Sequence, residues 1–549
     1  MKLFDKVLLF VVVPVCTSFS YITTHVQYRP ISFTGSHAGG RWLGASPLAA
    51  SVKQTESSSA NTTDIAVVDD DDDSAQTIIA SSAVVDTTKS DLQLFIEKNI
   101  LLGNEASPET LAIVTIYFVE GALGLARLAQ SYLLKDELSL GPAELSALTG
   151  LFVLPWTIKP VYGFLSDGFP LFGYQRKSYL ICAGLLGGLS YSILGYGGFW
   201  ESLSTSAATT GTVIALMVSS ACIAFSDVVV DGIVVTRSRE RDASVAGSLQ
   251  SLCWGAAAVG GLLSAYFSGS LLEVLPVRSI FSITAFLPFL VAFIALGVDE
   301  EPIAVRLGSG KDETLIDGVK DQVSKLWGAL KQPAIWKPAL FIFLWQSTPT
   351  ADGAFFFFLT NDLQLGPEFL GRVRLVTAGA GLAGVWLYNQ YFKNYKIKDI
   401  LFWSTIASFP LGMLPVLLVT HLNRDLGISD TALIYGDDVA LAALGEVAFL
   451  PTLVLAARLC PPGVEAVLFA TLMSIFNGAG TLGTEVGAAL TKFAGITDAN
   501  FDNLAQLIVL CNITSLWPLV LIGWLDGVGE VSEEDIESEE SENAVAIED

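Results

Sequence analysis

Apolar stretches of about 20 residues recur twelve times along this chain, and each is long enough for a helix to cross the hydrocarbon core of a bilayer. They lie near residues 111–134, 143–166, 178–198, 211–235, 245–270, 278–298, 334–360, 369–390, 398–420, 434–458, 464–490 and 503–525. The composition agrees, because 52% of the 549 residues are hydrophobic and only 15% are charged. In a soluble protein about one-quarter of the residues are charged. We therefore expect an all-α membrane protein with twelve transmembrane helices.

The predicted spans divide into a first half at 111–298 and a second half at 334–525, joined by a polar central loop at 299–333. Six spans, a long loop and six spans is the layout of the major facilitator fold, which we predict here. Lys and Arg concentrate in the even-numbered loops between spans, with Arg372 and Arg374 as the main exceptions. By the positive-inside rule, the even loops and both chain ends face one compartment.

The N-terminal residues have the composition of a targeting sequence. Residues 1–18 place two lysines before a short apolar run, which is typical of a signal peptide. Residues 19–60 are predicted to be a transit-peptide-like segment, because no Asp or Glu occurs between 19 and 55. Such a two-part leader resembles that of proteins sent to the complex plastids of algae, so we expect a plastid envelope protein. The alternatives are a plain signal followed by a disordered luminal segment, and a location in the plasma membrane or another endomembrane.

The net charge of −25 is largely local. Acidic residues gather in a polar linker at 61–110 and in a tail at 526–549, both predicted to be solvated. This pattern argues against nucleic acid as a partner. The six cysteines show no metal-binding spacing, and the chain has no evident nucleophile–base pair or phosphate-binding loop. We therefore expect neither an enzyme nor a bound cofactor or metal.

Charged side chains inside the predicted spans are the main functional candidates, because a charge in the middle of a membrane is costly. The first span carries Glu120 and Arg127, seven residues apart and so on one helix face. Arg127 is predicted to bind an anionic group of the substrate, since a guanidinium fits a carboxylate with two parallel hydrogen bonds. The alternative is an internal ion pair with Glu120 or Asp227.

The fourth span carries Asp227 and Asp231, four residues apart on one face. Neighbouring carboxylates favour the uptake of a proton, so the pair is predicted to receive a coupling proton or to accept hydrogen bonds from a substrate amino group. The alternative is a structural pair with a Lys or Arg at the helix end. Asp352 in the seventh span and Glu446 in the tenth complete the predicted substrate-binding residues.

Residues 154–179, LPWTIKPVYGFLSDGFPLFGYQRKSY, run from an apolar helix into a short loop rich in Gly, Pro and charge. A small residue lets helices approach closely, and an acid at a helix end can pair with a basic loop. The stretch is therefore predicted to be a transporter gate rather than a substrate site. Its gating candidates are Lys159, Gly163, Asp167, Gly173, Arg176 and Lys177.

Several long motifs stand out in the chain: GLARLAQSYLLKDELSLGPAE at 124–144, PWTIKPVYGFLSDGFPLFGYQRKSY at 155–179, SDVVVDGIVV at 226–235, SLQSLCWG at 248–255, PEFLGRVRLV at 367–376 and LCPPGVEAVLFATLMSIFNGAG at 459–480. Together they resemble the folate–biopterin transporter family, most closely its plastid branch in plants and algae, over about residues 111–525. The resemblance implies a twelve-span major facilitator fold and movement of folates or pterins. The chain departs from the family pattern at Thr236, where Glu is usual, and at Glu120, where related chains often have Gln.

We therefore predict a secondary active transporter that works by alternating access, with its site between the two halves near mid-membrane. The glutamate carboxylate of a folate would bind Arg127, and the pterin amino group would donate to Asp227 or Asp231. Membrane lipids and a co-transported proton are the other predicted partners. Transport of another organic anion or aromatic metabolite remains the alternative within this class, and a membrane receptor or enzyme is the alternative of another class.

Overall fold

The computed structural model of the chain describes residues 95–97, 100–101, 103–202, 204–239, 243–300, 302, 324, 326–393, 395–458 and 465–526. These residues belong to two compact units, one formed by 107–526 and the other by the described residues before Ser107. In the smaller unit the Glu97 carboxylate accepts a hydrogen bond from the Ala106 N–H over 3.1 Å. The predicted leader at 1–60, most of the linker and the central loop, and the tail beyond 526 lie outside the described residues.

The described secondary structure of the larger unit is helical, apart from one isolated β-bridge between Leu171 and Tyr174. The first half comprises α4 (Pro108–Ala122), α5 (Leu125–Tyr132), η2 (Leu133–Glu137), α6 (Pro142–Thr157), α7 (Lys159–Gly168), α8 (Lys177–Gly195), α9 (Gly197–Glu201), α10 (Thr205–Arg239), α11 (Ala243–Val274), α12 (Val277–Ile294) and η3 (Ala295–Gly297).

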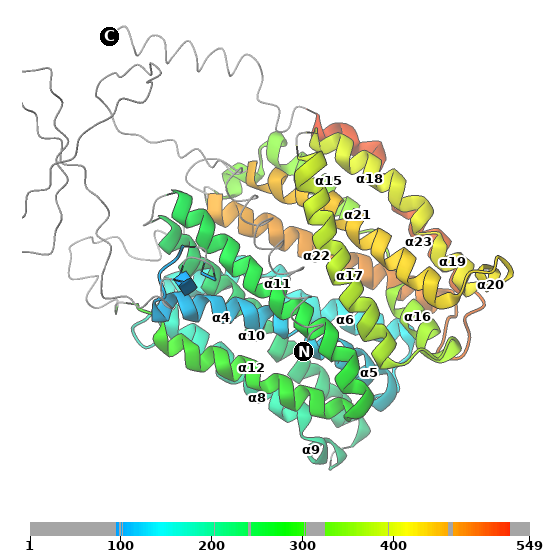
Figure 1. The fold of residues 1–549 in the computed structure, drawn as a ribbon, viewed down its shortest axis with the longest axis horizontal. Helices are drawn as coiled ribbons and strands as arrows, with labels where there is room; N and C mark the ends of the chain where they lie inside the picture. Colours follow the sequence, from blue (N-terminus) through cyan, green and yellow to red (C-terminus); the bar gives the residue numbers. More distant parts are fainter. Residues whose placement is uncertain are drawn as a thin grey trace, which may run out of the picture. The chain divides into compact units, whose positions relative to one another are not determined.

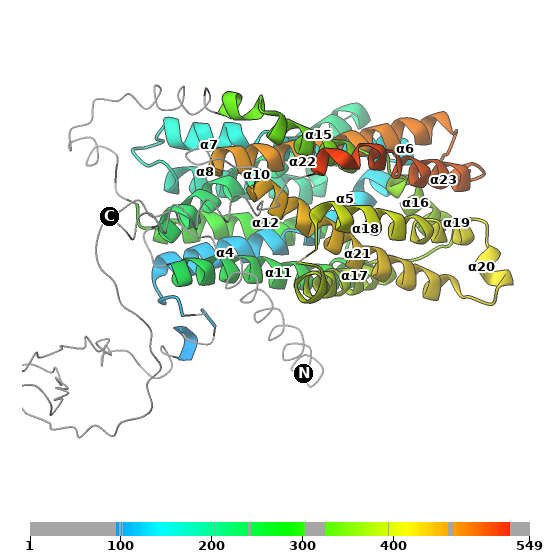
Figure 2. The same cartoon turned by 90° about the horizontal axis from the view of Figure 1, so that it is seen from above.

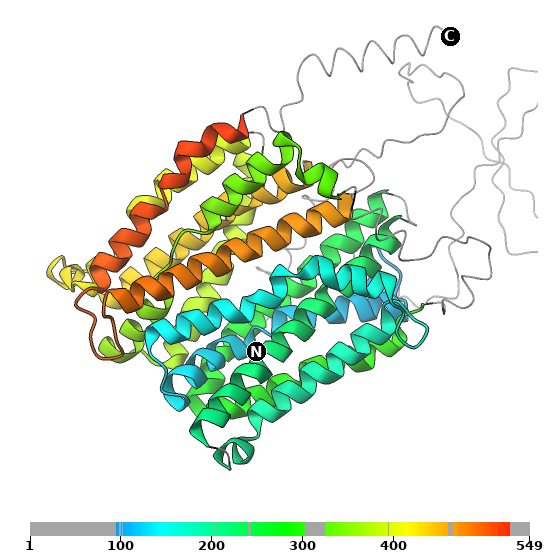
Figure 3. The same cartoon turned by 180° about the vertical axis from the view of Figure 1, so that it is seen from behind.

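The second half comprises α15 (Pro333–Gln346), α16 (Asp352–Phe357), η4 (Phe358–Asp362), α17 (Pro367–Leu387), η5 (Tyr388–Phe392), α18 (Ile397–Leu411), α19 (Leu414–Val419), α20 (Leu422–Asp425), α21 (Asp430–Arg458), α22 (Glu465–Phe493), α23 (Leu504–Thr514) and η6 (Trp517–Leu525). Figures 1 and 3 show the helices of the first half, blue to green, gathered into one bundle, and those of the second half, yellow to red, into another beside it.

Each predicted span coincides with one helix or with helical pieces placed end to end. Within the described ranges, eight segments are long and apolar enough to cross a membrane: Pro108–Glu137, Pro142–Ser166, Lys177–Gly195, Ser206–Val234, Ser251–Val274, Val277–Gly297, Ile397–Val419 and Leu504–Leu525. The other four spans are built on α15 and α16, α17, α21 and α22, where short pieces or charged residues reduce the apolar length. The prediction of an all-α membrane protein is confirmed.

The second and seventh spans are each interrupted. The second breaks between α6 and α7 at Ile158, which has a φ of −105° and a ψ of 19°. Pro160 lies two residues later, and a proline has no N–H to continue a helical ladder. The seventh span breaks between α15 and α16, where Pro349 lies in the connection. Broken helices free backbone groups and place side chains such as Lys159 at a helix start in the middle of a span.

The two halves share a structural joint between their first and second spans. Residues 138–142 and 363–367 both have the sequence Leu-x-Leu-Gly-Pro, and each follows a π-helical turn. The middle residues, Ser139 and Gln364, both have a positive φ, of 51° and 53°. In each joint the two leucine N–H groups donate to carbonyls five and six residues earlier. The proline then starts the next helix, where its fixed φ suits the first turn.

The halves meet along two pairs of helices, α6 with α22 and α11 with α17. Figure 2 shows the two pairs on opposite sides of the bundle. At the second pair the backbones nearly touch, because a Cβ on Gly371 would lie 2.6 Å from the Cα of Gly269. At the first pair, the Asn477 side-chain amide donates to the Trp156 carbonyl over 3.3 Å. Small residues at such crossings allow close packing of membrane helices.

Candidate substrate site

Five polar side chains from three helices meet inside the first half, and we call them the first-half cluster: Tyr117 and Glu120 of α4, Lys159 of α7, and Asp227 and Asp231 of α10. Nζ of Lys159 lies 2.5 Å from Oδ2 of Asp227, with side chains only 17% and 16% exposed. The Tyr117 hydroxyl donates a hydrogen bond to Oδ1 of Asp231. Glu120 lies within electrostatic range of Asp227, Asp231 and Lys159. The cluster thus holds three carboxyl groups and one ammonium.

Glu120 is the least satisfied member of this cluster. Its Oε1 is buried and has no hydrogen-bond partner among the described residues. The side chain lines a small pocket between α4, α8, α10 and α12, together with Cys222, Ser226 and mostly apolar residues. A buried carboxyl oxygen without a partner is costly, so this position is suited to meeting a substrate group or a proton.

The break in the second span explains how Lys159 reaches Asp227. Lys159 is the first residue of α7, and its ammonium also lies 4.7 Å from the centre of the Trp156 ring. The sequence prediction placed Lys159 in a gate and Asp227 in the site, and the structure brings the two together. Asp227 thus has a basic partner, as in the alternative of a pair with a Lys or Arg at the helix end, while its role in binding stays a prediction.

Arg127 lies on α5 with an exposed side chain. No ion pair or side-chain hydrogen bond of Arg127 occurs among the residues that the structure describes. The alternative of an internal pair with Glu120 or Asp227 is not found, since the cation beside Asp227 is Lys159. The guanidinium is thus open to an external anion.

The predicted residues of the second half lie in two separate places. Asp352 is the first residue of α16, is exposed, and lies within electrostatic range of Asp438 on α21. Asp437, beside it, is 8% exposed, and its Oδ1 has no hydrogen-bond partner in the described part of the chain. Glu446 lies two turns farther along α21, against the glycines of α17, where its side chain would be 3.6 Å from a Cβ on Gly381. Asp352 and Glu446 therefore do not form one group.

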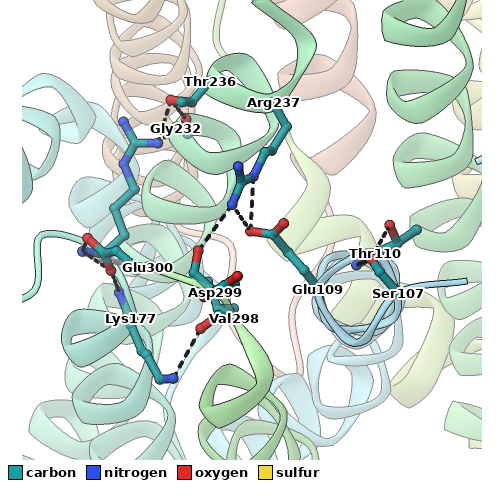
Figure 4. A network of polar contacts seen from close by, with 11 residues as sticks. Ser107, Glu109, Thr110, Lys177, Gly232, Thr236, Arg237, Val298, Asp299 and Glu300 are labelled. Carbon is teal, nitrogen blue, oxygen red and sulfur yellow. Dashed lines mark hydrogen bonds and ion pairs between the residues drawn. The ribbon is translucent and has the colours of Figure 1, made fainter. Parts of the chain in front are cut away.

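Two gating candidates, Arg176 and Lys177, lie at the even-loop end of the first half. They belong to a network that we call the even-loop latch, formed with Glu109, Gly232, Thr236, Arg237, Leu296, Val298 and Glu300 (Figure 4). The Glu300 carboxylate accepts hydrogen bonds from the backbone N–H groups of residues 175–177, at 2.8–3.1 Å. The Lys177 ammonium donates to the carbonyls of Leu296 and Val298 over 2.7 and 3.0 Å. A carboxylate at a helix N-terminus is favourable because it satisfies unpaired N–H groups near the positive end of the helix dipole.

Arg176 and Arg237 join the latch to the fourth span. Nη1 of Arg176 donates to the Gly232 carbonyl and, over 2.8 Å, to the Thr236 hydroxyl. Nη2 of Arg237 lies 2.9 Å from Oε1 of Glu109 at the start of α4. The latch thus ties together the even-loop ends of the first, third, fourth and sixth spans. Thr236 accepts a hydrogen bond from Arg176 but supplies no charge.

The remaining gating candidates have simpler surroundings. Gly173 has a φ of 86°, a backbone conformation that favours glycine, and lies in the short bridged turn between α7 and α8. A Cβ on Gly163 would meet only Val228, at 3.8 Å, so this position tolerates a small side chain. Asp167 lies in α7, and its side chain is outside what the structure describes.

The structure adds several candidate residues that the sequence analysis did not assign to the site or the gate: Tyr117, Arg374, Asp437, Asp438, Glu109 and Glu300. Asp437 and Asp438 fall inside the predicted tenth span, so the rule that intramembrane charges are functional candidates should have found them. Glu300 was assigned to the central loop, and nothing in its local sequence indicates that it caps a helix more than 120 residues away.

Comparisons with known proteins agree with this architecture. Residues 120–545 match the BT1 family. The chain is 48% identical to a folate-biopterin transporter of Synechocystis sp., over 79% of this chain and 85% of that protein. It is 32% identical to folate transporter 2 of Plasmodium falciparum, over 74% and 87% of the two chains. The crystal structure of the nucleoside transporter NupG superposes with a TM-score of 0.55 at 14% identity, covering 77% of this chain and 99% of that one.

The structural likeness shows the fold alone, and it confirms the predicted major facilitator fold. The family match covers well over half of the chain, and the similarity to the cyanobacterial protein extends through most of both sequences. The assignment to the plastid branch stays a prediction. With its two six-span halves and the matches just described, this chain belongs to the BT1 family, the folate–biopterin transporters.

Proposed function

We propose that this chain moves folates or related pterins across a membrane by alternating access between its two halves. Two of its relatives carry folate or folate-biopterin in their names, and one of them is nearly half identical to it. The observation that carries the proposal for the site is the first-half cluster together with Arg127 on the same span. Carboxylates suit the amino groups of a pterin, and an open guanidinium suits a carboxylate.

In the proposed site Arg127 binds a carboxylate of the substrate, and Asp227 or Asp231 accepts from the pterin amino group. Asp352 and Glu446 would act from the second half, and Asp352 is the better placed of the two because it is exposed at the start of a broken helix. The gate would be the even-loop latch with Gly163, Asp167 and Gly173. Opening or closing that end requires the latch contacts to rearrange.

We further propose that transport is coupled to protons through the first-half cluster. Three carboxyl groups beside one ammonium leave an excess of negative charge when all are ionised, and one bound proton reduces that repulsion. Asp227→Asn and Asp231→Asn keep size and hydrogen bonding but cannot titrate. The variant that removes the coupling residue should lose accumulation driven by a proton gradient and retain exchange of internal for external substrate.

Uptake by the purified chain in lipid vesicles tests the proposal. Labelled folic acid and biopterin are supplied with and without an inward proton gradient, and protein-free vesicles give the background. Uptake of either compound supports the proposed substrate class, and stimulation by the gradient supports coupling. Unlabelled competitors are then added in excess. If another organic anion or aromatic metabolite abolishes uptake and folate does not, the substrate belongs to that other class.

The proposed location is a plastid envelope. Fusing residues 1–55 to a fluorescent protein in a plastid-bearing alga tests this separately from transport. Fluorescence in the plastid supports the proposed plastid location. Export or retention in the endoplasmic reticulum would contradict it and would leave the transport proposal intact.

A further inference from the structure

Arg374 is a second arginine inside a predicted span, and it comes from the opposite half to Arg127. It lies on α17, seven residues from the helix start and thus about 10 Å along the helix. Its side chain is half-buried, and among the described residues no ion pair or side-chain hydrogen bond involves it. An arginine at this depth without a partner is costly, so a functional role is the default expectation.

Arg372 lies two residues away on the same helix and differs from Arg374 in exposure and in ion pairing. It is 63% exposed and is paired with Glu368 one turn earlier. Because successive residues on a helix point about 100° apart, Arg372 and Arg374 face different directions. Arg372 is thus paired on its own helix, whereas no ion pair of Arg374 occurs in the described part of the chain.

Arg127 and Arg374 each lie one turn beyond a glycine that packs against α11. Gly124 precedes Arg127 by one turn, and a Cβ on it would lie 2.6 Å from Oγ of Ser264 in α11. Gly371 precedes Arg374 by one turn, and a Cβ on it would lie 3.6 Å from the carbonyl oxygen of the residue after Ser264. The two guanidinium groups are close enough to act on each other as like charges.

We infer that Arg127 and Arg374 form a two-arginine anion site across the interface between the halves, and that this site takes the two carboxylates of a dianionic substrate tail. This inference rests on the proposed function and adds a residue and a substrate class to it. A glutamate tail carries two carboxylates on one flexible carbon chain, so each can meet one planar guanidinium fork.

An anion shared by the halves also affects their movement. Without substrate, the like charges on opposite halves repel, and this opposes their approach. A bound dianion turns the repulsion into two attractions and so favours the state in which the halves are close around it. A ligand shifts a conformational equilibrium only through such a difference in affinity between the states. A substrate without carboxylates lacks this effect.

The experiment compares Arg374→Gln, Arg374→Lys and the control Arg372→Gln in the purified full chain. Binding of 4-aminobenzoylglutamate, a dianion without a pterin, is measured by calorimetry. We expect Arg374→Gln to weaken this binding roughly tenfold or more, as loss of a charge-assisted hydrogen bond does. Arg374→Lys should fall between, because it keeps the charge and loses the fork, and Arg372→Gln should stay within about twofold of the unaltered chain.

Vesicle uptake then separates this inference from the proposed function. Arg374→Gln should raise the KM for folic acid by a similar factor and leave biopterin, which has no carboxylate, nearly unchanged. An equal loss for both compounds, unaltered dianion binding in Arg374→Gln, or no dianion binding by the unaltered chain would overturn the arginine pair. The unaltered chain could instead bind the dianion, and lose that binding in Arg374→Gln, but move neither folic acid nor biopterin. That result would overturn the proposed substrates and leave the anion site supported.

Discussion

The ammonium of Lys159 and the carboxylate of Asp227 form an ion pair 2.5 Å long between the second and fourth spans. Each side chain is largely buried, and Lys159 starts a helix at the point where the second span is broken. The pair therefore serves two purposes at once: it neutralises one of three neighbouring acids and it holds the broken helix against α10. Both effects depend on burial, because an ion pair in water is worth little.

Breaking this pair should destabilise the protein strongly. Lys159→Ala and Asp227→Ala each leave a buried charge without its partner, which costs about 3 kcal/mol of unfolding free energy or more. The exchanged variant Lys159→Asp with Asp227→Lys should recover part of that loss, since the charges again face each other. Thermal unfolding in detergent measures the three variants.

The pair of Lys398 with Asp526 is the matched control. It is also 2.5 Å long, but its side chains are 35% and 63% exposed. Lys398→Ala should cost less than about 1 kcal/mol. Equal effects at the buried and the exposed pair would contradict a special role for the Lys159 pair.

Introducing an acid at residue 236 should tighten the even-loop latch. In Thr236→Glu the Arg176 guanidinium, which now donates to the Thr236 hydroxyl over 2.8 Å, gains a charged acceptor. A Glu carboxylate adds an attraction between opposite charges and a second acceptor oxygen to this contact, so we expect a higher unfolding temperature and slower uptake. Thr236→Gln, similar in size but neutral, should change neither by much. A variant with Glu that transports at the normal rate would show that the latch does not move during the cycle.

The joints at residues 138–142 and 363–367 should respond alike to substitution. Ser139 and Gln364 adopt a left-handed backbone conformation that is particularly unfavourable for β-branched residues. Val at either position should lower the unfolding free energy by about 1 kcal/mol or more relative to Gly at the same position. Thermal unfolding of the four single variants checks this. A lower unfolding free energy for Val at one joint only would show that the two joints do not contribute equally to stability.

The connection before α21 should weaken in acid. Arg424 hydrogen-bonds Asp430, and this holds the pKa of Asp430 below its ordinary value of about 3.9. Because the folded-state pKa is lowered, the stabilisation is present above about pH 4 and is lost as the pH falls through the lower folded-state value. Hydrogen exchange of residues 420–430 in the unaltered chain and in Asp430→Asn should differ at pH 6, and the difference should shrink as the pH falls below about 4. A difference that stays the same from pH 6 down to the lowest pH at which the chain remains folded would rule out this titration.

The spans were predictable from sequence because a membrane imposes a length and a composition on each helix. The pairing of Lys159 with Asp227 was not, because 68 residues separate them and only the break at Ile158 brings the lysine into reach. The same holds for the role of Arg374. In the sequence it looks like an exception to the loop-charge rule, and only the packing of α17 on α11 shows that it faces the first half.

The two Leu-x-Leu-Gly-Pro joints share one backbone conformation, but the turns that precede them differ in charge. The turn before the first contains Lys135, Asp136 and Glu137, and the turn before the second contains Thr360, Asn361 and Asp362. Geometry in this chain is thus duplicated while chemistry has diverged between the copies. A substitution in the turn before one joint therefore changes the charge at that end of one half and leaves the backbone of the other joint as it is.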